Sequence, residues 1–416
     1  SVAPREDDEL GADRTSALRL TDAQRRVVSY PRSGGERLFV RGPAGTGKST
    51  ALMTRLAALL QEGRRPYEIL VLVPQRALAG RYERSLSRLE GAPTRGGADI
   101  VTFYSLSRRA VALFWPLIAR DAGFRRPDIE PTFLTIETAQ YFMWRIVEPL
   151  IATEGYFAEL TIRRERLLSQ LMDNLNKSAL VGFGHTDILP RLRGAWAGSP
   201  EHVASYVQAQ DCAIRFREYC LQHDLLDFSL TTEALSNNLT EHPVYQRYFR
   251  ARYGHFIVDN VEENVPVAQD MIAWAIGECE SAVLAYDEGG GFRVFLGADA
   301  EGGRALAEGC AEELVLDELL GANQDCLAFA GAVRRTLGLT SPRQGLRGNL
   351  RGAIGDRGSG GRYWISMIKW AVDRVAERVS AGAKPSEIAL VAPYVRGVTR
   401  FAIEEELSAR HIGMHL

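Results

Sequence analysis

Eight consecutive residues near the start of the chain have the types and spacing of a loop that binds phosphate. Glycines let backbone N–H groups turn inward around phosphate oxygens, and the N-terminus of a following helix adds partial positive charge. Lys48 would then reach the β- and γ-phosphates, and the hydroxyl of Ser49 would be a ligand of Mg²⁺. The motif predicts that the chain binds a nucleoside triphosphate. It reads Gly42, Pro43, Ala44, Gly45, Thr46, Gly47, Lys48 and Ser49, which fits G-x-x-x-x-G-K-[ST] without a mismatch.

A loop of this kind needs a strand before it and a helix after it, and the sequence supplies both. The apolar run Leu38-Phe39-Val40 precedes the loop, and an amphipathic run from Thr50 to Leu60 follows it. We therefore count Thr50 among the nucleotide-binding residues. Strands that alternate with helices in this way predict an α/β fold with a parallel sheet. The further strand signals are Ile69–Val73, Asp99–Thr102, His255–Asp259 and Ser281–Ala285.

Between these strand signals the chain becomes helical, over residues 105–225. Apolar residues recur there at helical spacing, and strand signals are scarce. We interpret this stretch as an all-helical domain inserted into one α/β domain, which comprises residues 20–104 and 226–300. We place a loose tail at residues 1–19 and an incomplete second α/β domain at residues 301–416. The expected helices of the insertion are Ile136–Ile151, Ile162–Leu180 and Val203–His223.

The last part of the chain contains a stretch rich in Gly and Arg, Ser341–Gly361, which is typical of a mobile loop. The pattern after it predicts a helix at Trp364–Val379, a strand at Glu387–Val391 and a helix at Val398–Leu407. This order indicates an α/β domain that is unfinished at Leu416, so we expect the sequence to be a fragment.

The composition excludes several classes of protein. A hydrophobic fraction of 46% and a charged fraction of 25% are typical of a soluble globular protein. No apolar run approaches the roughly 18 residues that are needed to cross a membrane. The net charge of −2 means that any DNA site must be a local patch. The five cysteines form no C-x-x-C pair, which indicates reduced residues of a cytoplasmic protein.

Further segments share their order with the motifs of one known family. Leu20–Arg25 matches a glutamine-containing motif before the phosphate loop, and Thr102–Leu106 matches a segment that contacts single-stranded DNA. Leu225–Phe228 leads into Phe256–Asp259, which has the form of a Walker B strand. The chain therefore resembles the N-terminal portion of superfamily 1 DNA helicases of the UvrD/PcrA/Rep type. The resemblance covers roughly residues 20–416 and implies a RecA-like P-loop fold with part of a second RecA-like domain.

The resemblance also implies a role for particular residues. Gln24 would hold the adenine edge of ATP, and Asp259 would hold Mg²⁺ together with Ser49. Structural alternatives remain open, since Gln24 also suits a helix start and Asp259 also suits a cap at a strand end. The residues that would contact single-stranded DNA are Arg76, Thr102, Phe103, Tyr104 and Phe295. Phe103 and Tyr104 are equally suited to a core, and Arg76 to a solvated surface.

Residues that the family uses for hydrolysis are replaced in this chain. The family has Glu after the Walker B Asp, and this chain has Asn260. Asn cannot accept a proton, and loss of a positioned base typically costs about 10²–10⁴ in rate. The positions of the Gln and the Arg that sense the γ-phosphate are Gly290 and Leu296. We expect Lys48, Asp259 and Asn260 to form a catalytic site in which hydrolysis is slow or absent.

Two glutamates stand beside this site in the sequence. Glu262 takes the glutamine position of the Walker B motif, and Glu263 follows it. With Asp259 they form an acidic cluster, which we interpret as solvated surface for the two glutamates and not as a separate metal site. A later motif of the family falls near Leu319–Ala322 and lacks its arginine.

Two functions remain open. The first is a fragment of a UvrD-like DNA motor that uses ATP and Mg²⁺ to move along single-stranded DNA in DNA repair. The second is a binding or scaffold subunit that kept the fold, lost hydrolysis and works with a protein partner such as a nuclease subunit. Val71–Gln75 supports the second function, because it resembles the V-P-E-Q segment of the AddB subunit of helicase–nuclease complexes. In that family a P-loop persists while other helicase motifs are lost.

Overall fold

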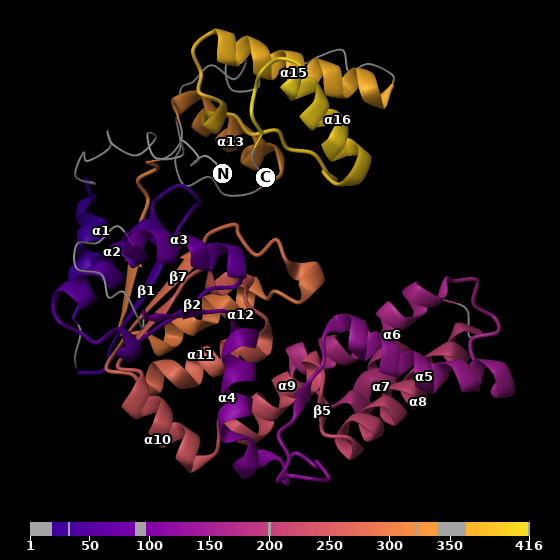
Figure 1. Ribbon diagram of the computed structural model, residues 1–416. Helices are drawn as coiled ribbons and strands as arrows, with labels where there is room; N and C mark the ends of the chain where they lie inside the picture. Colours follow the sequence, from indigo (N-terminus) through magenta and orange to yellow (C-terminus); the bar gives the residue numbers. More distant parts are fainter. Residues whose placement is uncertain are drawn as a thin grey trace, which may run out of the picture. The chain divides into compact units, whose positions relative to one another are not determined.

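The computed structural model describes residues 19–31, 34–87, 97–198, 201–320, 323–338 and 363–414 (Figure 1). The chain divides into two compact units, Ser1–Gly321 and Ala322–Leu416, and each is described by itself. The expected tail up to residue 18 and the expected mobile loop Ser341–Gly361 lie outside the described residues.

A six-stranded sheet forms the centre of the first unit, and every pairing in it is parallel. This confirms the predicted α/β fold with a parallel sheet. The carboxyl ends of parallel strands meet at one edge, so the loops that follow the strands lie together. In spatial order the strands are β3 (Asp99–Val101), β2 (Ile69–Leu72), β6 (His255–Val258), β7 (Ser281–Asp287), β1 (Glu36–Gly42) and β8 (Glu312–Val315).

Helices cover both faces of this sheet. Along β1, Leu38 and Val40 belong to one buried cluster, whereas Phe39 between them belongs to another. Successive side chains of a strand point to opposite faces, so the two clusters lie on opposite sides of the sheet. One cluster includes residues of α1 (Asp22–Ser29), α2 (Lys48–Gln61) and α3 (Arg76–Ser87). The other includes residues of α4 (Phe103–Ile118) and α11 (Pro266–Glu278).

The helical part of the first unit lies to one side of the sheet, and α4 leads toward it (Figure 1). All three helices predicted for the insertion are present, as α5 (Ile136–Glu154), α6 (Arg164–Val181) and α8 (Glu201–Gln222). This part also contains two short strands that pair in parallel, β4 (Thr132–Phe133) and β5 (Leu225–Leu226). The remaining helices are α7 (Ile188–Ala195), α9 (Phe228–Glu233), a π-helical turn at Ala234–Leu239, α10 (Pro243–Arg252) and α12 (Ala300–Ala305).

The sheet extends beyond residue 300, where we placed the end of the α/β domain, and this boundary was wrong. Strand β8 pairs in parallel with β1, from Leu38 opposite Glu312 to Arg41 opposite Val315. Only Leu314 of this edge strand is buried. Its sequence, Glu-Glu-Leu-Val, therefore lacks the apolar run that marks an inner strand.

The described part of the second unit is helical. It contains α13 (Gln324–Thr336), α15 (Trp364–Ser380) and α16 (Gly397–Ser408), so both predicted helices are present. The predicted strand Glu387–Val391 is absent, since Glu387 ends a 3₁₀ turn and the next four residues have no regular structure. A strand needs a hydrogen-bonded neighbour, and no other strand is present among the described residues of this unit.

No helix in the described part of the chain is both long and apolar enough to cross a membrane. All five cysteines are free, and three of them are buried.

A fully buried arginine ties the first two helices together. The Arg55 guanidinium donates hydrogen bonds to the carbonyl oxygens of Val27 at 3.0 Å and Tyr30 at 2.8 Å, both at the end of α1.

We expect Arg55→Met to lower the free energy of unfolding by about 3 kcal/mol, because it leaves these buried carbonyls unpaired. Urea denaturation followed by circular dichroism measures the change. Arg64→Met, at an exposed ion pair with Glu280, is the control and should lose less than about 1 kcal/mol. Equal losses in both variants would contradict the prediction.

Candidate nucleotide-binding site

The phosphate loop and two carboxylates meet at the carboxyl edge of the sheet. The loop follows β1, Asp259 directly follows β6, and Asp287 is the last residue of β7. These three strands are neighbours in the order β6-β7-β1. This edge is where open parallel sheets bind their ligands.

The glycines of the loop are required by its close packing. Gly47 has a φ of 76°, and a Cβ placed on it would lie 2.2 Å from the side-chain nitrogen of Gln24. A Cβ on Gly42 would lie 2.0 Å from the carbonyl oxygen of Leu316. The loop then passes directly into α2, which begins at Lys48. The predicted strand, loop and helix are therefore all present.

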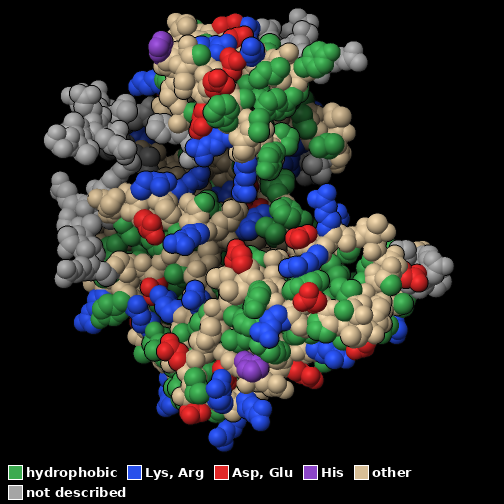
Figure 2. All heavy atoms as spheres, turned by 45° about the vertical axis from the view of Figure 1, so that its right-hand side comes forward, with side chains coloured by type: hydrophobic (Ala, Val, Ile, Leu, Met, Phe, Trp, Pro, Cys, Tyr) green, Lys and Arg blue, Asp and Glu red, His purple; other side chains and the backbone are tan. Residues whose placement is uncertain are grey.

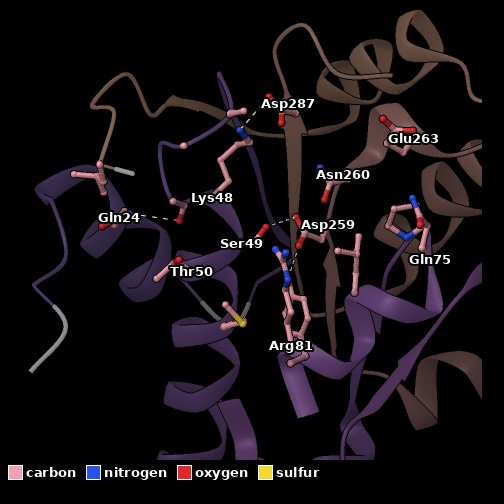
Figure 3. Close-up of a pocket in the computed structure, with 18 of the residues that line it drawn as sticks. Gln24, Lys48, Ser49, Thr50, Gln75, Arg81, Asp259, Asn260, Glu263 and Asp287 are labelled. Carbon is pink, nitrogen blue, oxygen red and sulfur yellow. Dashed lines mark hydrogen bonds and ion pairs between the residues drawn. The ribbon is translucent and has the colours of Figure 1, made fainter. Parts of the chain in front are cut away.

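Lys48 lies inside the loop with 7% of its surface exposed. Its Nζ donates to the carbonyl oxygens of Gly42 at 2.7 Å and Pro43 at 2.9 Å. The same Nζ lies 3.4 Å from Oδ1 of Asp287. Burial raises the pKa of Asp287, and the positive charge of Lys48 opposes that rise. Lys48 is thus held at the loop with its charge directed toward the end of β7 (Figure 3).

Ser49 and Asp259 form the oxygen pair that we predicted for Mg²⁺. The Ser49 hydroxyl donates to Oδ1 of Asp259 at 3.2 Å, and the Tyr82 hydroxyl donates to Oδ2 at 2.9 Å. Burial raises the pKa of Asp259, while the hydrogen bonds from Ser49 and Tyr82 lower it. Mg²⁺ is usually bound by one or two such protein oxygens together with substrate phosphates, so these residues fit the ion.

Gln24 connects α1 to the loop. Its Oε1 accepts from the backbone N–H of Thr21, and Thr21 in turn caps the helix. Its Nε2 donates to the carbonyl oxygens of Thr46 at 3.2 Å and Gly47 at 3.4 Å. The helix-start role that we left open is therefore present, together with a bridge to the loop. An adenine contact by Gln24 stays a prediction.

The residues after Asp259 form a hydrogen-bonded network. Asn260 has a left-handed backbone with φ of 53°, and its Nδ2 donates to Oε1 of Glu262 at 2.9 Å. Oε2 of Glu262 accepts from the backbone N–H of Asp287 at 2.9 Å. Glu262 is buried, so our interpretation of it as solvated was wrong, and burial raises its pKa to about 7. Glu263 accepts from the backbone N–H groups of three residues, 291 to 293.

Residues of the phosphate loop line a cavity of about 690 Å³ together with Gln24, Asp259 and Asp287, and this volume suits a nucleotide. Figure 3 shows Lys48 and Asp287 on one side of Asp259, and Gln24 at the far side of Lys48. Thr50 also lines the cavity. In full, the lining comprises Arg19, Leu20, Gln24, Ala44, Gly45, Gly47, Lys48, Ser49, Thr50, Met53, Pro74, Gln75, Leu78, Arg81, Tyr82, Asp259, Asn260, Glu263, Asp287 and Leu320.

A second cavity, of about 470 Å³, brings together four of the five predicted DNA-binding residues, Arg76, Thr102, Phe103 and Tyr104. Arg76 begins α3 with an exposed side chain, and the Thr102 hydroxyl caps α4 by accepting from the N–H of Ser105.

The aromatic residues of the predicted set differ in their exposure. Phe103 is 7% exposed and belongs to the core, the alternative that we left open, and a contact with DNA stays a prediction. Tyr104 is half-buried, and its ring stacks on that of Phe228 with 4.7 Å between the centroids. Phe295 is 75% exposed and does not line the cavity.

The match to a family model agrees with this geometry. The family described as UvrD/REP helicase N-terminal domain matches residues 20–282. The chain belongs to the UvrD/REP helicase family. The matched segment runs from the start of α1 into β7 and includes the whole phosphate loop, Asp259 and Asn260. No curated protein matches the chain.

Two residues of this UvrD/REP-type site were not predicted from the sequence. The Tyr82 hydroxyl donates a hydrogen bond to Asp259, and the neighbouring residue Arg81 lines the cavity. Ala79 and Tyr82 have the spacing of a buried helical face, which predicts burial of the ring. Nothing in that spacing indicates that the hydroxyl reaches a carboxylate 177 residues further along the chain.

The raised pKa of Glu262 predicts a pH dependence. In the folded state this carboxyl holds its proton up to about pH 7, whereas its ordinary value is 4.5. A group whose folded pKa is raised stabilises the fold at low pH and loses that contribution as pH rises through the folded value. Between pH 5 and 8 we expect the wild type to lose about 1–3 kcal/mol of stability relative to Glu262→Gln. Urea denaturation at both pH values tests this, and parallel changes in the two proteins would contradict it.

Proposed function

We propose that this UvrD/REP-family chain binds ATP with Mg²⁺ at the phosphate loop and hydrolyses it slowly or not at all. The observation that carries the proposal is the arrangement around Asp259. Its carboxylate accepts from Ser49 beside Lys48, as a Mg²⁺–phosphate site requires. The next residue, Asn260, offers no group that can accept a proton.

Slow hydrolysis is supported by the surroundings of Asn260. Glu263 lines the same cavity, but its two oxygens accept three backbone N–H groups. Asp287 lies beside Lys48, and Glu262 is absent from the cavity wall. Thus no carboxylate among the described lining residues replaces the glutamate that the family resemblance places after Asp259.

Single-stranded DNA is the proposed partner of the second cavity. Arg76 offers a cation there, and Tyr104 offers an aromatic ring, the two features that single-strand sites combine. On the face drawn in Figure 2, acidic side chains are interspersed with basic ones over the first unit. A local site of this kind is therefore a better candidate than a broad basic surface.

A second candidate is a subunit that binds ATP and a partner without moving along DNA. The hydrogen bond from Asn260 to Glu262 favours this second candidate. Asn260 is part of a hydrogen-bonded network that continues from Glu262 to the backbone of Asp287, so the surrounding structure is adapted to an asparagine. Both candidates bind ATP, and turnover separates them.

We expect the wild type to bind ATP in Mg²⁺, and Lys48→Ala to bind it at least about tenfold more weakly, because a charge-assisted phosphate contact is lost. Isothermal titration calorimetry measures both affinities. Lys177→Ala, an exposed lysine on α6, is the matched control and should bind as the wild type does. Equal ATP affinity of the wild type and Lys48→Ala would refute the proposed site.

Turnover is tested by restoring the missing base. A glutamate at 260 beside a buried Glu262 would place two carboxylates in contact, so the best variant combines Asn260→Glu with Glu262→Gln. For a disabled motor, we expect DNA-stimulated phosphate release to rise by about 10²-fold or more over the wild type. Glu262→Gln alone is the control. A double variant that binds ATP and stays inactive would favour the subunit without motor activity.

A further inference from the structure

We propose that Arg81 is a direct ligand of the terminal phosphate of the bound nucleoside triphosphate. This inference rests on the proposed function, since it requires that the cavity of about 690 Å³ holds such a nucleotide. It adds a residue from α3, outside the phosphate loop and the Walker B strand.

The position of Arg81 supports this role. Its side chain lines the nucleotide cavity together with Ser49 and Asp259, the pair that fits Mg²⁺. Figure 3 shows it rising from α3 on the Asp259 side of the cavity, away from Gln24. In a phosphate loop the serine-bound Mg²⁺ lies beside the β- and γ-phosphates, so this is the end of the cavity that receives the terminal phosphate.

The neighbouring residue fixes the helix that carries Arg81. Tyr82 is 1% exposed, and its ring lies in the core cluster beneath α3. Its hydroxyl donates to Oδ2 of Asp259 at 2.9 Å. Because Tyr82 is held at both its ring and its hydroxyl, the backbone of Arg81 is fixed at the cavity wall. Only the side chain of Arg81 has to move to meet a ligand.

The charged side chains that line the cavity leave Arg81 available to bind a phosphate. Lys48 and Arg19 also line the cavity, and Lys48 lies beside Asp287, whose carboxylate offsets part of its charge. Among the residues that the structure describes, Arg81 has neither a hydrogen bond nor an ion pair. Three carboxylates, Asp259, Glu263 and Asp287, also line the cavity and would repel a triphosphate without further positive charge.

The chemistry of the side chain fits the same ligand. A guanidinium is always charged and meets phosphate oxygens through two parallel N–H groups. The position where the family resemblance expects a γ-phosphate arginine is Leu296, whose side chain lines the second cavity instead. Arg81 therefore supplies, from another element, a contact that this chain lacks at that position.

The test compares ATP with ADP on the intact chain by isothermal titration calorimetry. We expect Arg81→Ala to weaken ATP binding by about 10- to 100-fold and ADP binding by less than about threefold. Arg81→Lys should fall between, since an ammonium keeps the charge and loses the paired geometry. Arg84→Ala, an exposed arginine on the same helix that does not line the cavity, is the control.

The same titrations in EDTA separate Arg81 from the metal. If Arg81 binds the terminal phosphate directly, the wild type prefers ATP over ADP without Mg²⁺, and Arg81→Ala loses most of this preference, with only the contribution of Lys48 remaining. A wild type without that preference, or an Arg81→Ala that weakens ATP and ADP equally or neither, overturns the inference while ATP binding itself stands. A wild type that binds no nucleotide overturns the proposed function and the inference together.

Discussion

The arrangement of the site depends on one buried carboxylate at the end of β6. Asp259 has only 2% of its surface exposed, so its charge must be matched by donors from the protein. Those donors are Ser49 at the start of α2 and Tyr82 in α3. One side chain thus holds three elements that are far apart in the sequence, and it does so at the edge where the sheet receives its ligand.

The replacement after Asp259 is built into a wider network. Asn260 donates to Glu262, Glu262 accepts from the backbone of Asp287, and Glu263 holds the segment that follows β7. The two glutamates therefore accept hydrogen bonds from backbone N–H groups at the end of β7 and in the segment after it. A change at residue 260 alone would alter a buried carboxyl whose pKa is already raised. A substitution at residue 260 would consequently also affect the packing of the segment after β7.

Much of the fold and of the candidate site could be predicted from the sequence, because the sequence patterns that indicate them are local. The phosphate loop, the inner strands and the long helices follow from residue types at fixed spacing. Strand β8 was missed because an edge strand with one buried residue carries no apolar run. The core role of Phe103 could not be separated from a DNA contact, because a strand-end motif does not say which face of α4 packs inward. The contact of Tyr82 with Asp259 depends on the tertiary fold, so it required the structure.

The amide of Gln24 has a further consequence. It already donates to Thr46 and Gly47 of the loop, so a base edge that recruits the same nitrogen must compete with those carbonyls. Nε2 carries two N–H groups, so recognition of the base and the shape of the phosphate loop would draw on the same two donors. A base that takes one of these N–H groups would replace one of the two hydrogen bonds between Gln24 and the loop. Selectivity for the base would in this way be expressed as a change in how the phosphates are held.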